Sequence, residues 1–157
     1  MIIDSLNEFA DATSVAAVAS TALIGNVIDL GATPQDLGNG EPMYLIITVD
    51  TSIITGGVAG TIAFSLASDA QAAIATDGSA TTHINTGTFV TDGVDASALL
   101  EGAVAYVGAV PTGAGKAYER YLGVLATVGT TTVTAGAINA FLTKDPSAWK
   151  AYADAVN

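Results

Sequence analysis

The sequence contains no cysteine and little positive charge. Without cysteine, none of the 157 residues can form a disulfide scaffold or a zinc–thiolate site. Four Lys and Arg residues stand against 15 Asp and Glu residues, which gives a formal net charge of −11 at pH 7. Because a phosphate backbone would repel such a chain, we expect no direct contact with nucleic acid.

Charged residues of either sign are scarce as well. They make up 12% of the chain, against roughly 25% in a typical globular protein, while half of the residues are hydrophobic. So much apolar material excludes a charge-rich disordered chain. The low charge of a soluble chain indicates that part of its surface is covered in use. The length suits one domain with one core, and we expect residues 1–157 to form it.

The chain also lacks a basic leader and a long hydrophobic run. Residues 14–24 are apolar, but Asp4, Glu8 and Asp11 precede them, where a signal peptide carries positive charge. No stretch approaches the ~20 apolar residues that span a bilayer. We therefore expect a soluble, unprocessed protein without a membrane contact.

The residues that are present form strand patterns. Residues 61–68 alternate cleanly, with Ile62, Phe64 and Leu66 expected to point inward and small residues outward. Residues 42–50 have one mixed face and one wholly apolar face, which is typical of a central strand. That apolar face holds Met43, Leu45, Ile47 and Val49. Further strands are expected at residues 27–30, 86–91, 103–110, 119–128 and 136–143, with a hairpin connection at 129–136. The inward faces of the last two strands hold Leu122, Val124, Ala126, Val128, Ile138, Ala140 and Leu142.

Turn residues recur between these strands, and the resulting pattern indicates the fold class. Short strands at regular intervals favour an all-β, antiparallel β-sandwich, and about eight of them suggest a jelly roll. The spacing does not separate a jelly roll from an immunoglobulin-like sandwich. Ala-rich residues 69–75 are compatible with one helical turn inside a loop.

The two ends of the chain are the candidate contact segments. Residues 1–12 could form a short helix or an extended arm, and residues 145–157 predict a helix capped by Asp145. Either end could reach a neighbouring molecule or fold back on its own sandwich. The candidate interface residues are Ile2, Ile3, Leu6, Phe9, Trp149 and Tyr152. Trp149, the single tryptophan, suits an anchor because Trp is enriched at interface hot spots.

Few residues offer catalytic chemistry. His83 is the only histidine, so it would have to serve any Ser/His/Asp triad, and a cupin-type metal site would need more imidazoles. We interpret His83 as a structural or surface residue. The loop 111–116 reads PTGAGK, but the Walker A pattern fails at Val110 and Ala117.

Carboxylates and aromatic residues give weaker alternatives. Asp92 and Asp95, with Asp69 and Asp77, could bind Ca²⁺, but no EF-hand pattern occurs, and a solvated acidic surface is the simpler interpretation. A hydrolase that uses a pair of carboxylates remains an alternative function. A module that binds a surface glycan or receptor is the main alternative function, although aromatic residues are only 6% of the chain.

Several segments resemble one protein family. They are MIIDSLNEFADA at 1–12, NVIDLGA at 26–32, GNGEPMYLIITVDT at 38–51, ERYLGVLATVG at 119–129 and AGAINAFLTKD at 135–145. In this order they resemble the Bbp16-like capsid cement proteins of tailed bacteriophages. Residues 53–115 match least well.

This resemblance implies a jelly roll that decorates the outer surface of the major capsid shell and stabilises the head by bridging capsomers. It implies the major capsid protein as partner and a homo-oligomer, with a dimer favoured. It implies no enzymatic activity and no cofactor. The protein would be made in the host bacterial cytoplasm and located on the virion.

Overall fold

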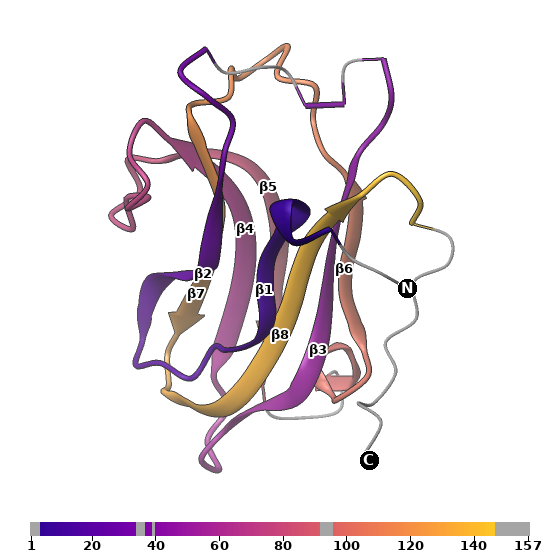
Figure 1. The fold of residues 1–157 in the computed structure, drawn as a ribbon. Helices are drawn as coiled ribbons and strands as arrows, with labels where there is room; N and C mark the ends of the chain where they lie inside the picture. Colours follow the sequence, from indigo (N-terminus) through magenta and orange to yellow (C-terminus); the bar gives the residue numbers. More distant parts are fainter. Residues whose placement is uncertain (1–3, 34–36, 39, 92–95, 147–157) are drawn as a thin grey trace.

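The protein is a two-layer β-sandwich, seen in a computed structural model that describes residues 4–33, 37–38, 40–91 and 96–146 (Figure 1). Two short 3-10 helices accompany its strands, η1 (Ser5–Asn7) and η2 (Ala96–Leu99). The strands are β1 (Glu8–Ser14), β2 (Ser20–Asp29), β3 (Tyr44–Thr55), β4 (Thr61–Asp69), β5 (Thr81–Val90), β6 (Val104–Ala109), β7 (Tyr121–Gly129) and β8 (Val133–Thr143).

The order of the strands defines a jelly roll. One sheet has the order β1-β8-β3-β6 and the other β2-β7-β4-β5, and all pairings are antiparallel. In the described chain, β4 and β5 form the single hairpin within a sheet, and every other connection crosses to the opposite sheet. This connectivity confirms the predicted jelly-roll sandwich and excludes the immunoglobulin-like alternative.

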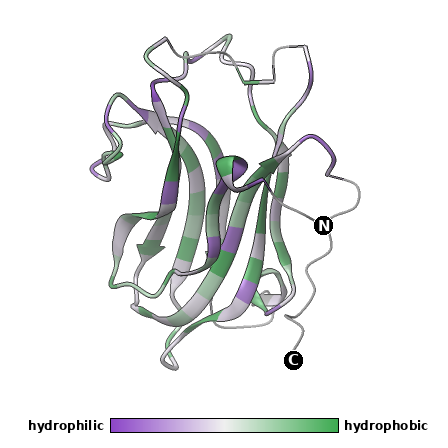
Figure 2. Ribbon diagram, viewed as in Figure 1, coloured by the Kyte–Doolittle hydropathy of each residue, from purple (hydrophilic) through white to green (hydrophobic). Residues whose placement is uncertain are grey.

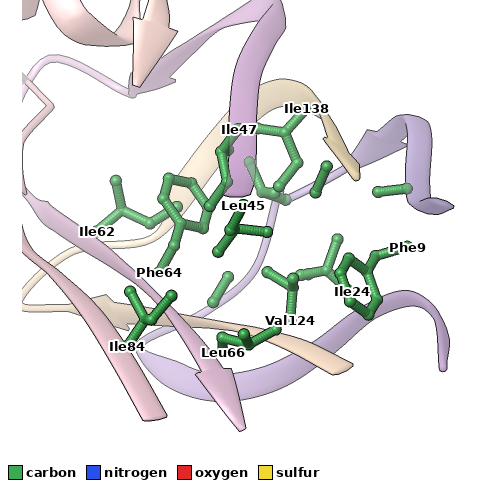
Figure 3. Packing of buried hydrophobic residues seen from close by; sticks show 14 of the residues in the cluster. Phe9, Ile24, Leu45, Ile47, Ile62, Phe64, Leu66, Ile84, Val124 and Ile138 are labelled. Atoms are coloured by element: carbon green, nitrogen blue, oxygen red, sulfur yellow. The ribbon is translucent and has the colours of Figure 1, made fainter. Parts of the chain in front are cut away.

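The core lies between the two sheets and follows the predicted alternation. Ile62, Phe64 and Leu66 of β4 are each fully buried and face the opposite sheet (Figure 3). The residues predicted to point inward in β7 and β8 also belong to this core. Leu45, Ile47 and Val49 of β3 belong to it as well, and Met43 packs at its margin. Figure 2 shows the alternation along β3 and β8 as bands of hydrophobic residues. Each large side chain buried this way contributes about 1.5–3 kcal/mol relative to an exposed one.

Several strands begin earlier than the sequence predicts. β2 begins at Ser20 rather than at residue 27, and β5 begins at Thr81 rather than at residue 86. The predicted hairpin at residues 129–136 is wrong, because β7 and β8 belong to different sheets, and their short connection crosses from one layer to the other before β8 begins at Val133. The N-terminal segment, left open as helix or arm, forms η1 and then β1.

The predicted helical turn at residues 69–75 is wrong. The carboxylate of Asp69 accepts hydrogen bonds from the backbone N–H groups of Gln71 at 3.1 Å and Ala75 at 2.9 Å, which hold an irregular loop. This loop covers the outer face of the second sheet, where Ile74 packs in a small separate cluster with Ala67 and Leu125. Ala67, expected to be an outward position, is therefore fully buried.

The predicted C-terminal helix lies outside the described residues, apart from Asp145 and Pro146. Within the described part of the chain, no helix is long and apolar enough to cross a membrane.

Candidate functional surfaces

Two of the six predicted interface residues are described, and they differ in exposure. Leu6, in η1, is 76% exposed and can contact another molecule. Phe9, in β1, is fully buried in the core of its own sandwich, as Figure 3 shows. For Phe9 the structure corresponds to the alternative in which the N-terminal segment packs on its own domain. The other four, Ile2, Ile3, Trp149 and Tyr152, lie outside the described residues.

His83 is held by side chains at one end of the core. Its Nε2 atom lies 2.8 Å from the hydroxyl of Ser68, and the ring of Tyr118 stacks on the imidazole with centroids 4.0 Å apart. The Ser68 hydroxyl also accepts a hydrogen bond of 3.1 Å from the backbone N–H of Glu119. Ser68 is 0% exposed, so its hydroxyl cannot meet a substrate in this conformation.

The electrostatics of this cluster favour a neutral imidazole. Burial lowers the pKa of His83, the positive charge of Lys116 lowers it further, and Glu119 partly opposes the shift. Glu119 itself accepts a hydrogen bond from Thr81 at 2.8 Å, which joins β5 to the segment before β7. The Ser68–His83 pair therefore closes one end of the sandwich, in agreement with a structural histidine.

The loop at residues 111–116 forms one wall of an open hollow of about 400 Å³ beside His83. The Lys116 amine donates to the carbonyl of Thr82 at 3.3 Å, and the Tyr118 hydroxyl donates to the carbonyl of Pro111 at 2.5 Å. These bonds fix the loop against its own domain. The arrangement is that of a connection entering β7, as the sequence predicts.

The acidic turns bind their own backbone. Hydrogen bonds from the N–H groups of Ala75 and Gln71 lower the pKa of Asp69, and bonds from Ser79 lower that of Asp77. Asp92 and Asp95 lie outside the described residues. Among the residues that are described, no group of three or more His, Asp or Glu side chains could hold a metal ion.

A groove of about 180 Å³ lies on the outer face of the β2-β7-β4-β5 sheet, beside the loop that follows β4. The hydroxyls of Thr21 and Thr127 lie 3.0 Å apart there. The other polar side chains in its lining belong to Ser65, Thr76, Thr82 and Asn85. No aromatic ring lines the groove, so it lacks the stacking platform that a glycan-binding module would use.

Some exposed large apolar side chains lie on the opposite side of the sandwich from β1 and β2. Four of the eight found among the described residues are Val90, Leu100, Val104 and Val107. They lie at the end of β5, beside η2 and along β6. Sequence reasoning missed this surface, although the uncharged run VAYVGA at β6 is its signal.

The fold places the chain among the all-β proteins of the jelly-roll class. Within that class the chain belongs to the Bbp16 family, because the model of that family matches residues 9–142. The matched region extends over all eight strands, save one residue at each end. No curated protein matches the chain.

Proposed function

We propose that this protein is a capsid cement protein of a tailed bacteriophage, which binds the outer surface of the major capsid shell and bridges capsomers. The observation that carries the proposal is the family match over residues 9–142, which includes the sandwich save one residue at each end. The segments that resemble Bbp16-like cement proteins lie mainly in the strands of this sandwich, from β1 to β8.

The charge of the molecule supports a place outside the shell. With a net charge of −11, the chain would be repelled by packaged DNA. A protein on the outer surface of the head does not contact that DNA, so a negative charge is compatible with this location. Many copies bind one shell, so each contact can be weak and the assembly still stable.

The packing of the sandwich supports a bridging role. A protein that joins two shell subunits must keep its two contact surfaces at a fixed separation. Fully buried side chains from both sheets, such as Phe64 and Ile138, interdigitate in one core, and such cores deform little. The contact surfaces then come from loops and strand edges, and the interface roles of Trp149 and Tyr152 stay predictions.

Binding of the purified protein to empty, expanded heads of the parent phage tests the proposal. We expect saturable binding at a fixed number of copies per shell, and a higher melting temperature for decorated heads than for bare ones. Unexpanded proheads of the same phage provide the comparison. If expanded heads bind no protein at any concentration, the proposed function is wrong.

A further inference from the structure

One end of the sandwich carries three connections without a charged side chain. They join β1 to β2, β3 to β4 and β7 to β8, at the lower end of the molecule in Figure 1. Together we call them the apolar end, and they are residues 15–19 (VAAVA), 56–60 (GGVAG) and 130–132 (TTT). The fourth connection at this end, between β5 and β6, does carry carboxylates: Glu101 in its described part, and Asp92 and Asp95 outside the described residues.

Hydrogen bonds join the three connections into one surface. The backbone of Ala17 exchanges two bonds of 3.1 and 3.0 Å with Val133, at the start of β8. The Thr131 hydroxyl donates to the carbonyl of Ala59 at 3.3 Å, which joins the β7–β8 connection to the β3–β4 connection. A partner therefore meets loops that are already ordered, so that less conformational entropy is lost on binding.

The larger side chains of this surface face solvent. Val18 and Val58 are 66% and 62% exposed, and Ile54, near the end of β3, is 47% exposed. A single exposed valine is ordinary on a protein surface. Here, exposed apolar side chains from separate connections share a surface that carries no charge, and such a patch is typical of a contact site.

The chemistry of the apolar end indicates which partner fits it. Nucleic acid and anionic lipid are repelled by a chain of −11. Segments that bind membrane surfaces combine large apolar or aromatic side chains with Lys or Arg, and the apolar end contains no aromatic and no basic residue. The same lack of aromatic rings gives a glycan nothing to stack on. The partner that fits is a protein surface that is itself apolar and uncharged.

The positive charges of the described chain lie at the other end of the sandwich. Lys116 and Arg120 belong to the connection that enters β7, and Lys144 follows β8. Arg120 pairs with Asp29 at 2.9 Å and Lys144 pairs with Glu41, and all four side chains are exposed. Charged groups that face water keep their hydration, whereas groups pressed against a partner lose it. The charged end is therefore suited to face solvent.

We propose that the apolar end is the surface by which this protein docks on the shell, against an apolar, uncharged patch of the major capsid protein. The sandwich then stands on its three uncharged connections, with its charged end toward solvent. This inference rests on the proposed function and deepens it, because the family match does not locate the surface that contacts the shell.

Binding of variants to empty, expanded heads of the parent phage tests this surface. Val58→Asp and Val18→Asp each place a carboxylate in a different connection of the apolar end. We expect each to raise the Kd for heads more than about tenfold, because docking would bury an unpaired charge. Ala114→Asp is the matched control and should bind like wild type, since Ala114 is exposed in the β6–β7 connection at the opposite end. Circular dichroism checks that all three variants are folded.

The behaviour of wild type separates this inference from the proposed function. If wild type binds no heads, the proposed function is wrong and this inference fails with it. If wild type binds, and both variants bind as tightly as Ala114→Asp, only the docking surface is wrong. A variant whose mass in solution, measured by light scattering, differs from that of wild type would assign the apolar end to contact between copies, and that result also overturns the inference.

Salt and lipid give independent readouts. Because the proposed contact contains no charge, the Kd of wild type for heads should not rise as NaCl increases from about 50 to 500 mM. A steep rise would mean docking through opposite charges and would contradict the proposal. Cosedimentation of wild type with phosphatidylcholine vesicles, lost in Val58→Asp, would make lipid the occupant of this surface instead of the shell.

Discussion

Two buried threonines show how single hydroxyls tie together separate parts of the chain. The Thr91 hydroxyl accepts a hydrogen bond of 3.0 Å from the N–H of Gly60 and lies 3.1 Å from the hydroxyl of Thr55. Thr55 donates in turn to the carbonyl of Val58 at 2.6 Å. The group joins the β3–β4 turn to the end of β5, and Thr91 is only 4% exposed.

Thr91→Val is therefore expected to lower the free energy of unfolding by about 1–3 kcal/mol, because it leaves the buried N–H of Gly60 without its acceptor. Urea unfolding followed by circular dichroism measures this change. Thr88→Val, at an exposed position of β5, is the control and should change little. Equal effects of the two substitutions would show that the buried hydrogen bond contributes nothing.

His83 is expected to make stability depend on pH. Because burial lowers its pKa in the folded state, the unfolded chain binds a proton more readily than the folded one. The free energy of unfolding should then fall as pH drops through about 6.5, the ordinary histidine pKa. Urea unfolding of wild type and His83→Gln at about pH 8 and pH 5.5 measures this. The free energy of unfolding should fall less between these pH values in His83→Gln than in wild type. An equal fall in both proteins would mean that groups other than His83 cause it.

The pairing of Ser68 with His83 could not be read from the sequence. It depends on the register of β4 against β5, in which Leu66 pairs with Ile84 and Ala67 with Thr82. His83 is the extra residue at this shift. Nothing in the pattern around His83 indicates such a bulge, so the sequence could argue for a structural histidine without naming its partner.

At the scale of the element, Gly25 allows β1 and β2 to approach each other. It lies within β2 with a φ of 65°, and a Cβ atom there would overlap the carbonyl oxygen of Phe9 in β1. Gly31, just after β2, has a φ of 92°, but a Cβ atom there would meet nothing. The positive φ favours glycine at both positions. At Gly25 the carbonyl oxygen of Phe9 also leaves no room for a side chain.

Gly25→Ala should therefore destabilise the protein clearly more than Gly31→Ala. The strain of a positive φ costs about 1 kcal/mol in both variants, and Gly25→Ala must also displace β1. Thermal unfolding of the two variants side by side measures the difference. Equal melting temperatures would mean that β1 moves away from β2 at little cost.

The elements that the sequence predicts best are those with clean alternation. β4 and β7 have inward residues at every second position, and their predicted faces are confirmed. β1 escaped prediction because Ala12 adopts a φ of 42° and the register shifts twice, which breaks the period of two. The helical turn predicted at residues 69–75 rested on the helix propensity of alanine. Hydrogen bonds from the backbone of this loop to the Asp69 carboxylate hold it in an irregular conformation instead.

At the scale of the molecule, the net charge should oppose association between copies. Added salt screens repulsion between two chains of −11, so the dimer that the family resemblance implies should become tighter as ionic strength rises from about 20 to 200 mM. Sedimentation at several salt concentrations measures the dissociation constant. A dimer that weakens with salt would indicate attraction between opposite charges at the interface.

The sequence predicts the class of the molecule better than its contacts. Strand spacing and segment order lead to a jelly roll and to the family, which the structure and the family model support. Which of the described strands lie at the edges of the sheets follows from the strand order, which the local pattern does not contain. Val107 looks like an ordinary strand residue until β6 is seen at the edge of its sheet.

The crossing connections also determine when the protein can fold. β8 lies between β1 and β3, so the first sheet is incomplete until residue 143 is available to pair. Before that, β4 and β5 form the one hairpin between neighbouring strands, and every other pairing must close a long loop. High contact order of this kind slows folding. A growing chain would therefore hold β1 without its partner strand, and β3 with β6 as its one available partner, until synthesis is almost finished. The first sheet can close only after nearly the whole chain has been made.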